Sequence, residues 1–170
     1  SAQAERALAM APARHLMVVA GEASGDALGA ALLAGLRAEI GDTVRLSGVG
    51  GPAMAAHGHQ SLFPMNELAV MGLLEVLPKV VPLRRRLLQA VAFAKAERPD
   101  ALITIDSPGF SLRLAERLAG TGIPRIHYVA PQVWAWRPWR VHHIARVVDH
   151  LLCLFPFEPP LFQAGGLDAT

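Results

Sequence analysis

The sequence predicts an α/β domain of the Rossmann-like kind: three layers, with helices on both faces of a mostly parallel central sheet of five or more strands. Two patterns predict it. A short apolar run without alternation, residues 16–20, is typical of a parallel strand buried on both faces. Most of the expected strands are followed by a turn with Gly, Pro or Asp and then by a segment of helical spacing, which is typical of βαβ units. The 170 residues, 52% hydrophobic and 18% charged, suit one ordered domain.

In the first half of the chain, strands are expected over residues 16–20 and 44–49. A helix over residues 26–39 places four leucines on one face, namely Leu28, Leu32, Leu33 and Leu36. The Gly50-Gly51-Pro52 turn introduces a short helix that ends near residue 57. Residues 61–83 follow no clear period: Leu62 and Phe63 are compatible with the start of a strand, and two prolines interrupt the apolar stretch that follows.

In the second half, a helix over residues 84–95 stops before Pro99, and a strand follows over residues 100–105. A helix over 111–119, closed by glycines, leads to a strand over 125–129, a short helix over 141–148 and a last strand over 151–155. Residues 157–170 leave room for one or two further helical turns. Ligands of such sheets bind beyond the carboxyl ends of the strands, so the candidate positions follow these strands.

The formal net charge of +2 hides an uneven distribution, because residues 113–148 hold six arginines and a single acid, Glu116. A local cationic stretch suits an anionic ligand or surface, but the sum is too small for a general nucleic-acid binder. No run of ~20 apolar residues predicts a membrane span, and no signal peptide is expected. Residues 1–14 are expected to be disordered or a cloning remnant, ahead of one domain over residues 15–170.

The turn after the first strand, residues 21–26, opens a helix with two glycines but lacks the spacing of a dinucleotide fingerprint or a P-loop. Glycines let backbone amides approach a ligand, and a helix start favours negative charge. The alternative is that Ser24 or Asp26 only caps the helix. Glu22 is harder to explain structurally, because a carboxylate at the mouth of a strand has no evident structural duty.

Asp106 lies at the mouth of another strand, before Ser107-Pro108-Gly109. A carboxylate there is suited to accept a proton from a substrate hydroxyl; the alternative is an Asx turn that holds the Pro-Gly bend. Glu22 and Asp106 are expected at the same edge of the sheet. His127, on a strand, is either a core histidine or a catalytic group, and Cys153 is expected to be inert core. No spacing of ligand residues resembles a metal site.

Two further segments carry candidate surface chemistry. Trp134, Trp136 and Trp139 are interleaved with arginines and suit stacking on a ligand, a membrane interface or plugging of the sheet edge. Residues 70–86 join an apolar, Pro-broken stretch to three arginines, the two components of interfacial membrane attachment. The alternative is a core helix followed by a solvated charge run.

Taken in order, several motifs resemble the lipid-A-disaccharide synthase family. They are residues 21–26 (GEASGD), 48–52 (GVGGP), 67–72 with 75–77, 105–106, 126–131 through 133–137 (VWAWR), and 155–158 (FPFE). The resemblance covers about residues 16–166. It implies a GT-B glycosyltransferase with two Rossmann-like halves, of which this chain is the N-terminal, acceptor-side half. The half that holds most UDP contacts is expected to be absent from it.

The resemblance implies the transfer from UDP-2,3-diacylglucosamine to 2,3-diacylglucosamine 1-phosphate, which gives a β-1,6-linked disaccharide and UDP in lipid A biosynthesis. No metal or cofactor is expected, a homo-oligomer is compatible with it, and the enzyme is expected at the inner face of the cytoplasmic membrane. The implied catalytic residues are Asp106 first and Glu22 second. The implied substrate-binding residues are Gly21, Ser24, Gly25, Asp26, Gly50, Gly51, Met71, Trp134, Trp136 and Arg137, and the implied membrane-facing residues are Met71, Leu73, Leu74, Leu77, Val81, Arg84, Arg85 and Arg86.

Two other classes stay open at this stage. One is another two-domain sugar-nucleotide enzyme, such as a protein similar to UDP-N-acetylglucosamine 2-epimerase, which would use a water-soluble substrate. The other is a non-catalytic module of flavodoxin-like shape, for which the turn over residues 21–26 is a poor phosphate loop.

Overall fold

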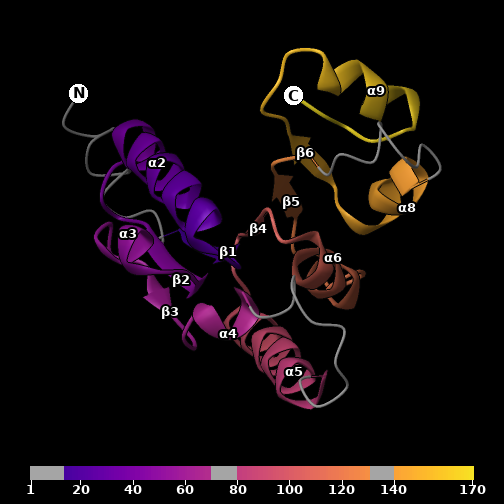
Figure 1. Ribbon diagram of the computed structural model, residues 1–170. Coiled ribbons are helices and arrows are strands. Elements are labelled where there is room, and N and C mark those ends of the chain that lie inside the picture. Colours follow the sequence, from indigo (N-terminus) through magenta and orange to yellow (C-terminus); the bar gives the residue numbers. More distant parts are fainter. Residues whose placement is uncertain (1–13, 70–79, 131–139) are drawn as a thin grey trace.

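The computed structural model describes residues 14–69, 80–130 and 140–170, and within them it confirms the α/β class (Figure 1). One sheet of six strands has the order β3-β2-β1-β4-β5-β6, and every pairing is parallel. The strands are β1 His15–Ala20, β2 Arg45–Val49, β3 Gln60–Ser61, β4 Ala101–Ile105, β5 Arg125–Tyr128 and β6 His150–Leu152. This is the Rossmann order, and it differs from the flavodoxin order, in which the third strand lies on the other side of the first.

Helices cover both faces of the sheet. They are α2 Ala23–Ile40, α3 Pro52–Ala55, α4 Asn66–Ala69, α5 Val80–Glu97, α6 Pro108–Arg117, α8 Arg140–Val147 and α9 Glu158–Ala164. Figure 1 shows α2 on one side of the sheet and α5, α6 and α8 on the other. No helix of the described ranges is long and apolar enough to cross a bilayer.

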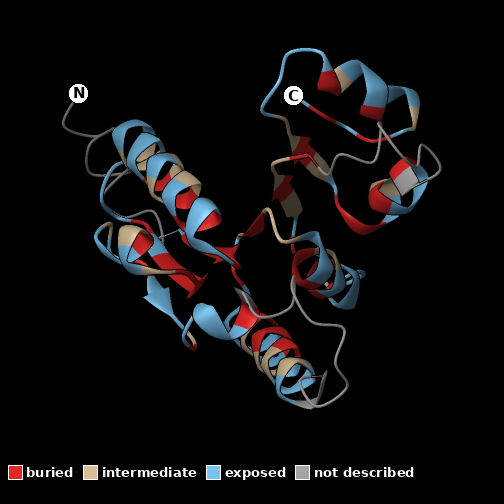
Figure 2. Cartoon of the chain, in the orientation of Figure 1, coloured by how far each residue is buried: buried red, intermediate tan, exposed pale blue. Residues whose placement is uncertain are grey.

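Two apolar cores follow from the alternation of side chains along the strands. Val18, Ala20 and Ile105 point to the face that α2 and α3 cover, where they pack with Leu33 and Met54. On the other face the strands pack against α5, α6 and α8. Figure 2 shows the consequence: the central strands β1, β2 and β4 are mostly red, whereas the edge strand β3 and the outer faces of the helices are pale blue.

Several expected boundaries are wrong. Helices α2 and α6 begin at Ala23 and Pro108, each three residues before the expected start, and α6 ends at Arg117 instead of residue 119. Helix α5 begins at Val80 instead of residue 84. Pro82 fits within it because first-turn amides have no intrahelical acceptor. Strand β6 ends at Leu152 instead of residue 155, because the buried Glu158 carboxylate bends the chain. Its Oε2 accepts hydrogen bonds from the backbone N–H groups of Leu154 and Phe155, at 3.2 and 3.1 Å.

Candidate active site at the carboxyl edge of the sheet

The topological switch point of the sheet lies between β1 and β4. From β1 the chain continues to β2 and β3 on one side, whereas β4 leads to β5 and β6 on the other, so the loops diverge at the carboxyl ends of these two strands. Ligands of open α/β sheets bind in the crevice at such a point. Ala20 of β1 pairs with Ile105 of β4, so Gly21 and Asp106 follow at the same level.

Both predicted carboxylates lie at this switch point. Glu22 is the exposed N-cap residue of α2, and its side chain makes no capping hydrogen bond. Asp106 is half-buried at the end of β4, and no hydrogen bond or ion pair joins its carboxylate to another described residue. Two carboxylates at one mouth, without partners in the described ranges, are suited to act on a ligand rather than on the fold.

The turn that carries Asp106 has an unusual backbone. Asp106 and Ser107 have φ values of 50° and 44°, and Val129, at the end of the neighbouring β5, has a φ of 74°. Left-handed conformations of non-glycine residues cost on the order of 1–3 kcal/mol each, and they cluster at functional sites. Strain at two adjacent strand ends therefore marks this part of the edge.

The Asx-turn interpretation of Asp106 is wrong. An Asx side chain bonds the backbone N–H two residues on, and that residue is Pro108, which has none. The turn is held by other groups: the Ser111 hydroxyl donates to the Asp106 carbonyl at 2.8 Å, and the Asp106 N–H donates to the Tyr128 carbonyl at 3.0 Å. The backbone of Asp106 is fixed while its carboxylate stays available. The helical pattern alone gave no sign of this role for Ser111.

Gly21 and Gly25 have packing reasons that the sequence did not reveal. A Cβ on Gly21 would meet the Ser107 Cβ at 2.7 Å, so only glycine lets the β1 and β4 loops approach so closely. A Cβ on Gly25 would lie 3.3 Å from that of Ala20. Ser24 is exposed in the first turn of α2. The substrate-binding roles of these three residues stay predictions.

Asp26 caps a helix, but not the helix in which it lies. Its buried carboxylate accepts hydrogen bonds from the backbone N–H groups of Gly51, Ala53 and Met54, at 2.9, 2.9 and 3.0 Å, at the start of α3. The expected local cap of α2 by Ser24 or Asp26 is absent, since no side chain caps that helix. Asp26 thus joins α2 to the loop after β2, and its contact with substrate stays a prediction.

Replacing Asp26 with Asn in the full-length protein should lower the free energy of unfolding by about 1–3 kcal/mol, the scale for buried donors left unpaired. The amide NH2 would face at least one backbone N–H of α3. Urea denaturation measures the change. The matched control is Asp42→Asn, because the Asp42 side chain is 89% exposed, and there the effect should stay within about 0.5 kcal/mol. Equal midpoints for both variants would contradict the capping role.

Gly50 and Gly51, at the mouth of β2, are also enclosed by protein atoms. A Cβ on Gly50 would lie 2.9 Å from the Met54 sulfur, and one on Gly51 would lie 2.9 Å from the Asp26 carboxyl carbon. The Gly50 N–H donates to the Ser61 hydroxyl at 3.1 Å. Close packing explains why glycine stands at both positions, and their contact with substrate stays a prediction.

Of the three arginines at the start of α5, Arg86 binds other residues of the domain. Its guanidinium donates to both oxygens of Glu67, at 2.6 and 2.9 Å, and lies over the Phe63 ring at 4.9 Å. This hydrogen bonding lowers the pKa of the Glu67 carboxyl. Arg84 and Arg85 are exposed, as is Leu88 one turn further along. The exposed arginines at the start of α5 are therefore Arg84 and Arg85, whereas the sequence indicated a face of three arginines.

Several predicted site residues lie outside the described residues, so the structure does not place them. They are Met71, Leu73, Leu74, Leu77, Trp134, Trp136 and Arg137. Val81 lies in α5, and nothing is described of its side chain. Their roles stay predictions.

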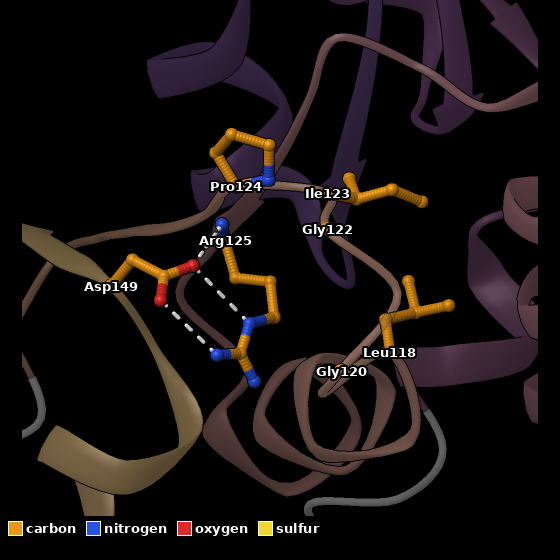
Figure 3. A pocket seen from close by; sticks show the side chains of 7 residues that line it. All are labelled: Leu118, Gly120, Gly122, Ile123, Pro124, Arg125 and Asp149. Atoms are coloured by element: carbon orange, nitrogen blue, oxygen red, sulfur yellow. Dashed lines mark hydrogen bonds and ion pairs between the residues drawn. The ribbon is translucent and has the colours of Figure 1, made fainter.

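A hollow on the surface lies at the amino ends of β5 and β6, opposite the carboxyl ends that carry the candidate site (Figure 3). Arg125 begins β5 and Asp149 precedes β6, and their side chains form an ion pair of 3.1 Å. Arg125 also donates to the Ala115 carbonyl at 3.3 Å. This arginine of the basic stretch is thus used to join α6, β5 and β6, away from the switch point.

In the described ranges, no group of three or more His, Cys, Asp or Glu side chains is arranged to hold a metal ion. Cys153 is half-buried, and burial together with the nearby Glu158 charge raises the pKa of its thiol to about 11. A thiol with so high a pKa is a poor nucleophile at neutral pH.

A Rossmann-order sheet with two available carboxylates at its switch point defines an α/β domain with a candidate ligand site at the carboxyl ends of its strands. Residues 16–170 match the family model described as lipid-A-disaccharide synthetase. The chain belongs to this family.

Curated relatives agree with this assignment. The chain is 56% identical over 147 residues to the lipid-A-disaccharide synthase of Granulibacter bethesdensis. The aligned residues cover 86% of this chain and 37% of that protein. It is 53% identical over 155 residues to that of Ruegeria pomeroyi, covering 91% and 38%. The match to that of Rhodospirillum centenum is 51% over 157 residues, covering 91% and 39%. The chain thus spans about two fifths of the length of these relatives.

Proposed function

We propose that this chain is the acceptor-side half of an inverting glycosyltransferase that makes the lipid A disaccharide. The full-length enzyme joins UDP-2,3-diacylglucosamine to 2,3-diacylglucosamine 1-phosphate through a β-1,6 linkage and releases UDP. Family membership, the Rossmann order of the sheet and the pair of carboxylates at the switch point support this function. The other classes considered from the sequence lack such support.

In the proposed reaction the primary hydroxyl of the acceptor attacks the anomeric carbon of the donor. The new C–O bond forms as the bond between that carbon and the UDP phosphate oxygen breaks, and the configuration inverts. The hydroxyl proton passes to the Asp106 carboxylate, and the bonding pair leaves with UDP. The observation that carries this role is the position of Asp106: half-buried at the switch point, on a turn fixed by Ser111, with its carboxylate unbonded within the described ranges.

Glu22 is the second candidate for the base. It lies beyond β1, next to Gly21, whose close packing against Ser107 brings the two loops together. It is more exposed than Asp106 and lies on a helix cap without the strained φ. For a general base a fixed position matters more than exposure, so Asp106 is preferred.

The enzyme must meet acylated substrates at a bilayer, which leads to peripheral attachment at the inner face of the cytoplasmic membrane. The described part of the attachment surface is the exposed face of α5 formed by Arg84, Arg85 and Leu88. Cations near an anionic surface contribute about 1 kcal/mol each, and apolar side chains add to this when they enter the interface. The apolar residues before α5 lie outside the described residues, and their part in attachment stays a prediction.

Replacing both Arg84 and Arg85 with Ser in the full-length protein should weaken binding to anionic vesicles by about 10- to 30-fold, the equivalent of about 1 kcal/mol per arginine. Arg86 is left in place because it holds Glu67. Vesicle sedimentation at low and high salt measures the partition coefficient, and salt should weaken the binding of the unaltered protein.

The matched control for this test is Arg113→Ser with Arg117→Ser, which removes two exposed arginines from α6. This pair should bind vesicles as the unaltered protein does. An equal loss in both pairs, or none in the α5 pair, would contradict attachment through α5.

A further inference from the structure

His127 is a buried histidine with one ring nitrogen left open. It lies in the middle of β5 with no exposed surface. Its Nδ1 is 2.7 Å from the Thr104 hydroxyl, whereas its Nε2 is buried and has no hydrogen-bond partner among the described residues. An unpaired buried polar group is costly, so the open nitrogen of a buried histidine calls for a partner that the described residues do not supply.

The hydrogen bond to Thr104 suits both tautomers of the neutral ring. The Thr104 hydroxyl donates either to the Nδ1 of His127 at 2.7 Å or to the Ile126 carbonyl at 3.4 Å, and in the second arrangement Nδ1–H donates to Thr104. In the first arrangement the ring carries its proton on Nε2, which is then a donor without an acceptor among the described residues. An acceptor beside Nε2 would favour this first arrangement.

Asp106 is the charged group that acts on this ring. Burial lowers the pKa of His127 to about 4, against the opposing effect of the Asp106 charge, so the imidazole is neutral near pH 7. Thr104 pairs with His127 across β4 and β5, and the Asp106 N–H donates to the carbonyl of Tyr128, the residue after His127, at 3.0 Å. The backbone of the candidate base is therefore held beside the strand that carries the ring.

The surroundings of His127 are polar where the rest of this core is apolar. Thr104, Ser111 and His127 are each no more than 1% exposed, within the cluster that packs β4 and β5 against α6. Ser111 already holds the Asp106 carbonyl, and Thr104 holds the ring. Three buried polar side chains beneath one strained turn indicate a support for that turn.

We propose that His127 is a positioning residue for Asp106, and that its Nε2–H donates a hydrogen bond to the Asp106 carboxylate, directly or through one buried water, in the substrate complex. This inference rests on the proposed function, because it assigns His127 to the base of that reaction. The ring orients the carboxylate toward the acceptor hydroxyl and does not itself take the proton.

Steady-state kinetics of the full-length enzyme test the proposal with two substitutions of His127. In His127→Asn the amide can keep the bond to Thr104 but lacks the distal donor, whereas in His127→Gln the amide nitrogen can take the place of Nε2. We expect the Asn variant to lower kcat about 10-fold with KM within about twofold, and the Gln variant to stay within about threefold of wild type. Equal losses in the two variants would overturn the proposal.

A double-mutant cycle with Asp106→Asn separates positioning from general damage to the fold. If His127 acts through Asp106, His127→Asn should change the residual turnover of the Asp106→Asn enzyme less than twofold. Should the Asn variant not fold, Thr104→Val replaces it, because it removes the hydroxyl that holds the ring through Nδ1. The loss of activity in Thr104→Val should also vanish in the Asp106→Asn background. The same fold loss in both backgrounds overturns the proposal.

The control is His59→Gln, at a second buried histidine with one open ring nitrogen. The Nε2 of His59 donates to the Val18 carbonyl at 2.9 Å, and its Nδ1 has no partner in the described ranges. Any loss there should be the same in both backgrounds. If the unaltered full-length enzyme makes no disaccharide, the proposed function fails; if it does and the cycle is additive, only the His127 inference fails.

Discussion

Replacing Asp106 with Asn in the full-length enzyme should lower kcat by about 100-fold or more, the usual scale for loss of a general base. The two side chains are nearly isosteric, and the Asp106 carboxylate makes no hydrogen bond within the described ranges, so the fold should be retained. The acceptor hydroxyl would keep its position but lose the group that removes its proton. Initial rates of disaccharide formation measure the effect.

Glu22→Gln provides the comparison for this experiment. If Asp106 is the base, the Gln variant should lose less activity than the Asp106→Asn variant, because Glu22 then contributes to binding or charge alone. Near-normal turnover of Asp106→Asn, together with a loss of about 100-fold in Glu22→Gln, would exchange the two roles. Melting temperatures of both variants should match that of the unaltered enzyme.

The second large effect concerns residues 1–170 alone, which should form no disaccharide. The matched region covers about two fifths of the relatives' length. In the proposed division of labour this half supplies the base and acceptor contacts, while most UDP contacts belong to the rest of the enzyme. Product assays at high protein concentration measure the prediction, with the full-length enzyme as the positive control.

The folded state of residues 1–170 must be measured beside the activity. Cooperative thermal unfolding with no product would support the division of labour, because a folded acceptor half would then lack only its donor site. Glycosyl transfer by residues 1–170 would contradict it and would place a complete active site within the six-stranded domain.

The sequence predicted the fold class because the first strand is an unbroken apolar run and because turns with Gly, Pro or Asp separate the expected strands from segments of helical spacing. Strands β1 and β4 differ by a single residue at the start from their expected ranges. The ends of β6 and α5 could not be predicted in the same way. The Glu158 side chain, from the next helix, binds the backbone just after β6. Helix α5 contains Pro82, although a proline in the sequence usually indicates a helix boundary.

The position of Glu22 and Asp106 at one edge of the sheet was also predictable, because parallel strands bring their carboxyl ends to that edge. The contacts around these two residues could not be predicted. Asp26 bonds backbone groups 25 to 28 residues away, and Gly21 packs against Ser107 from another loop. Neither contact leaves a local signature. The Nδ1 of His127 bonds to Thr104 on the neighbouring strand, and no motif marks Thr104. The sequence therefore could not show that only one ring nitrogen of His127 has a partner among the described residues.

The most direct test of the account is product analysis with the full-length enzyme and two donors, UDP-2,3-diacylglucosamine and UDP-N-acetylglucosamine, each with 2,3-diacylglucosamine 1-phosphate. Mass spectrometry should find the tetra-acylated β-1,6 disaccharide and an equal amount of UDP with the diacylated donor, and neither product with UDP-N-acetylglucosamine. Epimerisation of UDP-N-acetylglucosamine, or release of UDP without a disaccharide, would contradict the assignment of this domain to the lipid A disaccharide reaction.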